Sequence, residues 1–126
     1  MSDAHSSPSS SLPLLIVDDE PEIRDLLRSI LEDEGFRVLT ASNGAAALYA
    51  IQRTPVALIV TDLMMPQLSG LELAQRLRSN PHTAAIPLIL ISATVPQQVD
   101  HTFAAIIHKP FSIDVIVQAV HDLLPP

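Results

Sequence analysis

The stretch Ala57-Leu58-Ile59-Val60-Thr61-Asp62 decides the fold of this 126-residue chain. Its first four residues are all apolar, and Ile59 and Val60 are β-branched. A short run without polar alternation is typical of a strand that is buried on both faces, as the strands of a parallel sheet are. Asp62 follows just past the end of this run, after Thr61, so we expect its carboxylate at the carboxyl end of a central strand.

Similar apolar runs alternate with helical patterns along the rest of the chain. The expected strands are residues 12–17, 36–41, 57–60, 88–91 and 106–107, and the expected helices are residues 21–34, 45–53, 71–79 and 113–124. Strand and helix alternation with right-handed crossovers predicts an α/β fold with helices on both faces of the sheet. Five strands favour a flavodoxin-like, doubly wound parallel sheet in the order 2-1-3-4-5.

Length and composition limit the classes of function. The chain is long enough for one core, so we expect one domain over residues 12–126 and a disordered polar tail over residues 1–11. A net charge of -7 argues against nucleic acid or an anionic membrane as the direct partner. No cysteine, no apolar run of about 20 residues and no secretory signal pattern are present, which favours a cytoplasmic location.

Polar residues follow the apolar runs at the points where the strands are expected to end. Asp18 and Asp19 follow the first run, Asp62 the third, Ser92 the fourth and Lys109 the fifth. Ligands of such a sheet bind beyond the carboxyl ends of its strands, so these five side chains are predicted to meet at one edge. Taken singly, each could be an ordinary loop residue, and the two adjacent acids could simply favour a helix N-terminus. The combination indicates a functional site.

Crowded carboxylates repel one another unless a proton or a cation neutralises them. Mg2+ prefers oxygen ligands and binds through one or two carboxylates together with a phosphate, and Mn2+ is an alternative. A phosphoryl group in transfer spreads negative charge over its oxygens, which a cation, the Lys109 ammonium and the Ser92 hydroxyl can stabilise. The pattern therefore favours phosphoryl transfer to an Asp62 nucleophile.

At these residues the chain resembles the receiver domains of bacterial two-component response regulators. The resemblance rests on four motifs: Val17-Asp18-Asp19-Glu20, Thr61-Asp62-Leu63-Met64-Met65-Pro66, Ile91-Ser92-Ala93 and Lys109-Pro110-Phe111. It implies that Asp62 accepts the phosphoryl group, with Ser92 and Lys109 assisting. It also implies a metal site formed by Asp18, Asp19, Asp62 and the backbone carbonyl of Met64, and a cis peptide before Pro110.

The resemblance also implies the partners and the mode of action. A sensor histidine kinase or a phosphotransfer protein would donate the phosphoryl group, and an output protein would read the phosphorylated state. Such a domain is a phosphorylation-controlled switch and not a turnover enzyme, because it catalyses only its own phosphorylation and dephosphorylation.

The chain departs from the receiver pattern in one region. The position three residues before the lysine is usually aromatic, and here it is Ile106. Only sixteen residues separate Ser92 from Lys109, fewer than the family commonly has. We therefore expect the fourth helix of the family to be short or disordered, and the usual aromatic switch to be missing.

Three other functions are compatible with parts of the pattern. A pseudo-receiver would keep the fold as a phosphorylation-independent binding module, but such domains usually lack an acid or the lysine. A phosphate shuttle or sink would accept phosphoryl groups without an output face. A phosphatase of the haloacid dehalogenase type needs an Asp-x-Asp pair, whereas Leu63 and Met64 follow Asp62 here and the acidic pair is adjacent.

Overall fold

Five parallel strands form one sheet in the computed structural model, which describes residues 12–94 and 102–124. The elements are β2 (Leu14–Val17), α2 (Pro21–Asp33), β3 (Val38–Ala41), α3 (Gly44–Arg53), β4 (Leu58–Asp62), α4 (Gly70–Arg78), β5 (Leu88–Ser92), β6 (Ala105–His108) and α5 (Ile113–Leu123). The strand order is β3-β2-β4-β5-β6, which is the predicted order 2-1-3-4-5. The predicted fold class is confirmed.

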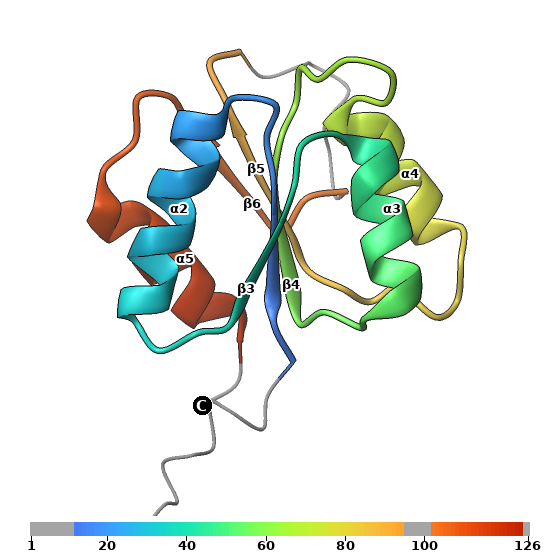
Figure 1. Cartoon of the computed structure of the whole chain (residues 1–126), viewed down its shortest axis with the longest axis horizontal. Coiled ribbons are helices and arrows are strands. Elements are labelled where there is room, and N and C mark those ends of the chain that lie inside the picture. Colours follow the sequence, from blue (N-terminus) through green and yellow to red (C-terminus); the bar gives the residue numbers. More distant parts are fainter. Residues whose placement is uncertain (1–11, 95–101, 125–126) are drawn as a thin grey trace, which may run out of the picture.

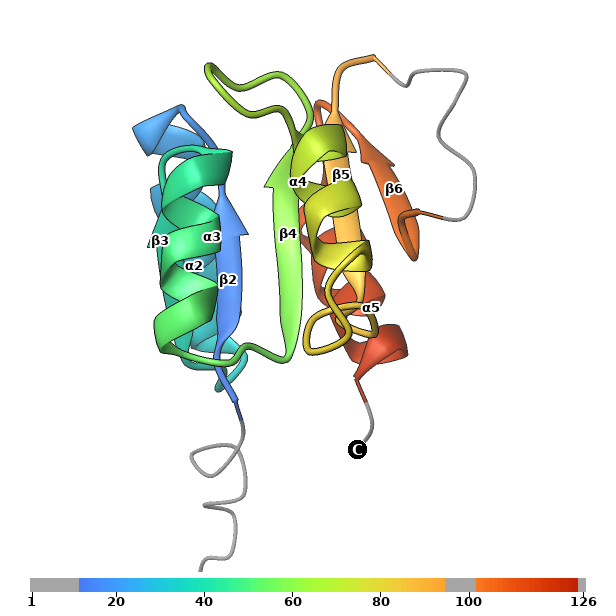
Figure 2. The same ribbon diagram turned by 90° about the vertical axis from the view of Figure 1, so that its right-hand side faces the viewer.

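The helices cover both faces of the sheet (Figure 1). Helices α2 and α5 contact each other on one face, and α3 and α4 contact each other on the opposite face. Seen from the side of α3 and α4, the strands lie in one layer behind these two helices (Figure 2). The order of strands changes direction after β3, so β2 and β4 lie side by side at the switch point.

Burial explains why the apolar runs form the central strands. Every residue of β2, β4 and β5 is buried, as expected of strands with helices on both sides, whereas β3 and β6 at the edges are partly exposed. Strand β3 begins at Val38, two residues later than predicted, because Phe36 still belongs to the turn that ends α2. That turn contains Gly35 with a φ of 96°, a conformation suited to glycine.

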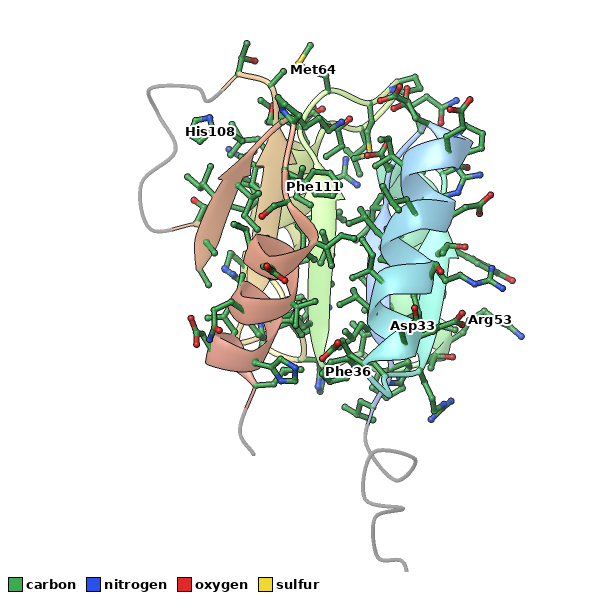
Figure 3. All side chains as sticks on the ribbon, turned by 90° about the vertical axis from the view of Figure 1, so that its left-hand side faces the viewer. Asp33, Phe36, Arg53, Met64, His108 and Phe111 are labelled. Atoms are coloured by element: carbon green, nitrogen blue, oxygen red, sulfur yellow. The ribbon has the colours of Figure 1, made fainter. Side chains whose placement is uncertain are left out.

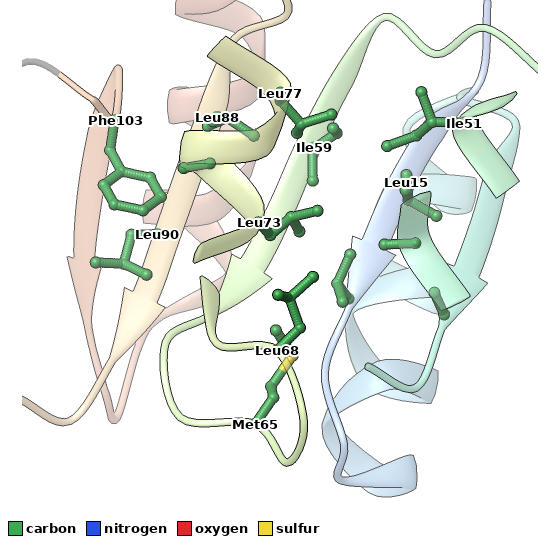
Figure 4. Close-up of a cluster of buried hydrophobic side chains, with 14 of the residues drawn as sticks. Leu15, Ile51, Ile59, Met65, Leu68, Leu73, Leu77, Leu88, Leu90 and Phe103 are labelled. Atoms are coloured by element: carbon green, nitrogen blue, oxygen red, sulfur yellow. The ribbon is translucent and has the colours of Figure 1, made fainter. Parts of the chain in front are cut away.

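Two apolar cores lie on the two faces of the sheet. The core beneath α3 and α4 includes Leu15, Ile59, Leu73, Leu77, Leu88, Leu90 and Phe103 (Figure 4). The core beneath α2 and α5 includes Leu14, Ile16, Leu27, Leu31, Val60, Ile116 and Val120. Alternate residues of each central strand contribute to opposite cores. Because the strands are parallel, the polar residues at their carboxyl ends lie at one edge of the sheet.

The region between β5 and β6 contains no helix in its described residues, which are 93–94 and 102–104. The expected short or disordered fourth helix falls largely on residues 95–101, which lie outside the described part of the chain, as does the predicted tail over residues 1–11. Phe103 is buried in the core beneath α3 and α4, and the partly buried Ile106 packs against the same core. Within the described ranges, no helix is long and apolar enough to cross a membrane.

Candidate functional site

The carboxyl ends of the strands bring four of the predicted side chains together. Asp62 is the last residue of β4, Ser92 is the last residue of β5, and Lys109 follows β6. Asp18 follows β2, which pairs with β4. Asp18, Asp62 and Ser92 are buried although they are polar, with exposed fractions of 2%, 7% and 2%. Buried polar groups without structural need are rare, so this edge of the sheet is the candidate site.

Asp18 and Asp62 are held by matching contacts. In Asp18, Oδ1 accepts the N–H of Glu20 at 2.9 Å, and in Asp62, Oδ1 accepts the N–H of Leu63 at 2.8 Å. The second oxygen of each carboxylate faces Lys109, whose Nζ lies 3.7 Å from Oδ2 of Asp18 and 3.5 Å from Oδ2 of Asp62. The backbone therefore fixes one oxygen of each acid, and the other oxygen faces the Lys109 ammonium.

Lys109 is positioned by the strand that precedes it. Its backbone N–H donates to the carbonyl of Ser92 at 3.0 Å, which extends the pairing between β5 and β6 by one bond. The peptide between Lys109 and Pro110 is cis, as the resemblance implied. The Nζ atom also lies 3.6 Å from Oε1 of Glu20, so three carboxylates share one ammonium.

The electrostatics follow from burial and this imbalance of charge. Desolvation raises the pKa of Asp18 and of Asp62, and repulsion from neighbouring carboxylates raises each further, although Lys109 acts in the opposite direction. Burial alone would lower the pKa of Lys109, but Asp18, Asp62 and Glu20 together raise it above its usual value. Lys109 is thus an ammonium at neutral pH, and the site holds an excess of negative charge.

A cavity of about 360 Å³ opens at this edge and gives access to the acids. Its lining consists of Asp19, Glu20, Asp62, Met64, Ser92, Ala93, Thr94 and Lys109. The hydroxyl oxygen of Ser92 accepts the N–H of Thr94 at 3.2 Å and lines the cavity. Figure 3 shows Met64 at this edge of the sheet, where the residue is 70% exposed.

The structure groups the acids differently from the sequence prediction. Side-chain oxygens of Asp18, Glu20 and Asp62 lie within 4.8 Å of one another, whereas the exposed Asp19 lines the cavity but lies outside this group. Sequence reasoning missed Glu20, although it stands next to the two predicted acids. The signal in the sequence is the position of Glu20, two residues after Asp18 in a short turn. In the structure the N–H of Glu20 bonds to Asp18, and the side chain of Glu20 lies on the same side as Lys109.

The loop after Asp62 is held close beneath the site. The N–H of Gly70 donates to the carbonyl of Leu63 at 2.8 Å, and a β-carbon at Gly70 would collide with the carbonyl of Asp62. Ser69 and Glu72 form a capping box at the start of α4, with Ser69 Oγ accepting the Glu72 N–H and Glu72 accepting the Ser69 N–H. Because Gly70 has no β-carbon, helix α4 can begin directly against the backbone of Asp62.

Known proteins match this chain over most of its length. The response regulator receiver domain family matches residues 14–121. Response regulator Rre1 of Synechocystis sp. is 34% identical over 119 residues, which cover 90% of this chain and 52% of that protein. Response regulator RR06 of Streptococcus pneumoniae is 34% identical over 116 residues, which cover 88% of this chain and 52% of that protein. The chain thus spans about half the length of these relatives.

Solved structures share the fold. Response regulator TrrA of Thermotoga maritima, crystallised in complex with Mg2+-BeF, has a TM-score of 0.79 and 34% identity, with coverage of 90% of this chain and 99% of that chain. Chemotaxis protein CheY4 of Vibrio cholerae has a TM-score of 0.83 at 24% identity, with coverage of 90% and 99%. With the family match over residues 14–121, these likenesses show that the chain belongs to the receiver domains of response regulators, the phosphorylation-controlled switches of two-component signalling.

Proposed function

We propose that Asp62 is the residue of this receiver domain that accepts the phosphoryl group. The observation that carries the proposal is the placement of its carboxylate. Asp62 ends the central strand β4, fixes Oδ1 on the Leu63 N–H, and directs Oδ2 toward Lys109 in a cavity that Ser92 also lines. A nucleophile, a cation and a hydroxyl therefore surround one space.

The transfer needs no covalent chemistry beyond one displacement. An oxygen of Asp62 forms a bond to phosphorus, and the bond between phosphorus and the leaving group of the donor breaks. With a phosphohistidine donor, the imidazole nitrogen leaves with the electron pair and becomes protonated. Lys109 loses its contact with an Asp62 oxygen and pairs with a phosphoryl oxygen, and the Ser92 hydroxyl donates to another.

The acidic group fits a hard divalent cation. The oxygens of Asp18, Glu20 and Asp62 are the donor type that Mg2+ prefers, and their negative charge exceeds what Lys109 can balance. Asp18 and Asp62 would hold Mg2+ or Mn2+ directly, with Asp19 and the Met64 carbonyl as the further predicted ligands and Glu20 at the rim. The bound ion supplies charge neutralisation for the phosphoryl oxygens.

The partners and the mode of action are also part of the proposal. A sensor histidine kinase or phosphotransfer protein donates the phosphoryl group, and an output protein reads the result. The domain catalyses only its own phosphorylation and dephosphorylation, because the phosphoryl group stays on its own side chain. The cytoplasmic location remains a prediction from the sequence.

Phosphorylation with a small donor tests the proposal. The chain is incubated with acetyl phosphate and Mg2+, and its intact mass is measured. We expect one added phosphoryl group, its absence in Asp62→Asn, and its retention in the matched variant Asp122→Asn, in which an exposed acid on α5 is changed. An unlabelled parent would favour the pseudo-receiver, and labelling of Asp62→Asn at the level of the parent would overturn the assignment.

A further inference from the structure

We infer that Arg24 is a positioning residue for the Asp18 carboxylate and thereby sets the affinity of the acidic site for a divalent cation. The inference rests on the proposed function, because it concerns the cation that the site would hold. Arg24 belongs to the first turn and a half of α2 and is half-buried. Its Nη1 donates to the backbone carbonyl of Asp18 at 2.8 Å.

The turn that carries Asp18 is short and is held by backbone bonds and by two cationic side chains, Arg24 and Lys109. It joins β2 to α2 over three residues, and the N-cap Glu20 makes no side-chain capping bond. Pro21 follows and has no N–H to donate. Backbone bonds run from the Asp18 N–H to the Ala41 carbonyl at 3.2 Å and from the Arg24 N–H to the Glu20 carbonyl at 3.0 Å, and the Glu20 N–H donates to Oδ1 of Asp18 at 2.9 Å. Lys109 pairs with the side chains of Asp18 and Glu20, whereas the Arg24 guanidinium bonds the Asp18 carbonyl.

These contacts decide where the free oxygen of Asp18 points. Oδ1 is used by the Glu20 N–H, so only Oδ2 is directed to the space that Lys109 and Asp62 share. Arg24 holds the peptide unit between Asp18 and Asp19 through the Asp18 carbonyl. A hydrogen bond from a charged donor to a carbonyl is stronger than one from a neutral donor. Here it restrains the peptide plane next to the Cα atom that carries the Asp18 side chain. Partners outside the ligand set typically change metal affinity by about 10- to 100-fold.

The charge of Arg24 acts in the opposite direction to its position. Removing a cation near an acidic site by itself favours the binding of another cation, because repulsion decreases. A loss of affinity on substitution of Arg24 therefore cannot come from the change of charge. Arg28 provides the matched control, since it lies one turn further along α2, is exposed, and pairs with Glu32 at 3.5 Å.

The experiment compares Arg24→Gln with Arg28→Gln, using calorimetric titration with Mg2+ and urea unfolding without metal. We expect roughly tenfold weaker Mg2+ binding in Arg24→Gln, parental or slightly tighter binding in Arg28→Gln, and recovery of most of the affinity in Arg24→Lys, which keeps a charged donor. Equal or tighter binding in Arg24→Gln would overturn the inference. So would a lower stability with an unchanged Kd, because that result describes a merely structural contact.

Failure of the proposed function gives a different result. A parent chain that binds no Mg2+ would overturn both the proposed cation site and the role of Arg24. A parent that binds Mg2+, together with equal affinities in Arg24→Gln and Arg28→Gln, would overturn the role of Arg24 alone.

Discussion

Asp18 and Asp62 use their carboxylates in the same way, although they are far apart in the sequence. Each gives Oδ1 to the backbone of its own loop, and each turns Oδ2 toward Nζ of Lys109, at 3.7 Å and 3.5 Å. One ammonium therefore contacts both buried acids and offsets part of the repulsion between them. Glu20 adds a third carboxylate at 3.6 Å, which leaves the site short of positive charge.

Removal of the ammonium should destabilise the protein. We expect Lys109→Gln to lower the free energy of unfolding by roughly 2 kcal/mol in the absence of metal, because it leaves buried acids without their partner. Urea unfolding in the presence of a chelator measures this change. The double variant Lys109→Gln/Asp62→Asn should recover much of the loss, and a double variant as unstable as the single one would contradict the repulsion argument.

Asp18 and Asp62 should each contribute less to the stability of the metal-free protein as the pH rises from acid to neutral. Burial raises the pKa of Asp18 and Asp62 above 3.8 in the folded state, so the folded protein binds their protons more tightly than the unfolded chain. The stabilisation is complete below about pH 3.8 and is lost as the pH rises through the raised pKa values. Lys109, with its pKa raised, keeps its contribution until the pH passes its own pKa.

Asp62→Asn tests the cost of the buried Asp62 charge at neutral pH. The amide oxygen can still accept the Leu63 N–H, while the charge is removed. We expect the variant to be more stable than the parent at neutral pH without metal, by on the order of 1 kcal/mol or about 4 °C in Tm. Addition of Mg2+ should narrow or reverse this difference in stability. The parent keeps the Asp62 carboxylate and binds the ion more tightly, so mass action stabilises it more than the variant. A variant that is less stable than the parent in chelator at pH 7 would contradict this account.

The loop after Asp62 contains a strained residue that glycine should relieve. Gln67 has a φ of 72°, and the Leu68 N–H donates to the Pro66 carbonyl at 2.8 Å, which together match the rare classic γ-turn. We expect Gln67→Gly to raise the free energy of unfolding by about 1 kcal/mol. Gln67→Ala keeps the β-carbon and should give no such gain. Equal stabilities of the two variants in thermal unfolding would show that the turn is not strained.

Gly70 should tolerate no side chain. A β-carbon there would collide with the backbone carbonyl of Asp62, and backbone cannot move aside as a flexible side chain can. We expect Gly70→Ala to cost about 1 to 3 kcal/mol of stability and to slow labelling of Asp62 by acetyl phosphate. The control is Ser79→Ala at the exposed end of α4, which should label at the parental rate. Parental stability and labelling in Gly70→Ala would contradict the predicted collision.

Peroxide should distinguish the two adjacent methionines of this loop. Met64 is 70% exposed and lines the cavity, whereas Met65 is 9% exposed and packs in the core beneath α3 and α4. We expect hydrogen peroxide to oxidise Met64 several-fold faster than Met65, because thioether oxidation depends on access. Peptide mass spectrometry over a time course gives both rates, and equal rates would show that the loop opens readily.

The sequence alone determined the sheet and the edge at which the acids meet. Apolar runs such as Ala57 to Val60 are typical of strands that are buried on both faces, and this pattern predicts a parallel sheet with helices on each side. The rule for the carboxyl ends of such strands then places Asp62, Ser92 and Lys109 together. These predictions depend on periodicity and on chain order, which a sequence contains in full.

Only the tertiary structure decided which acids share the Lys109 ammonium and which contacts hold those acids in place. Glu20 and not Asp19 joins Asp18 and Asp62, because the turn after β2 directs Glu20 toward Lys109. The contact of Arg24 with the Asp18 carbonyl and the positive φ of Gln67 were likewise not predicted. Such features depend on the dihedral angles of a few residues in short loops, where a rotation about one bond moves a side chain to another face without changing any pattern in the sequence.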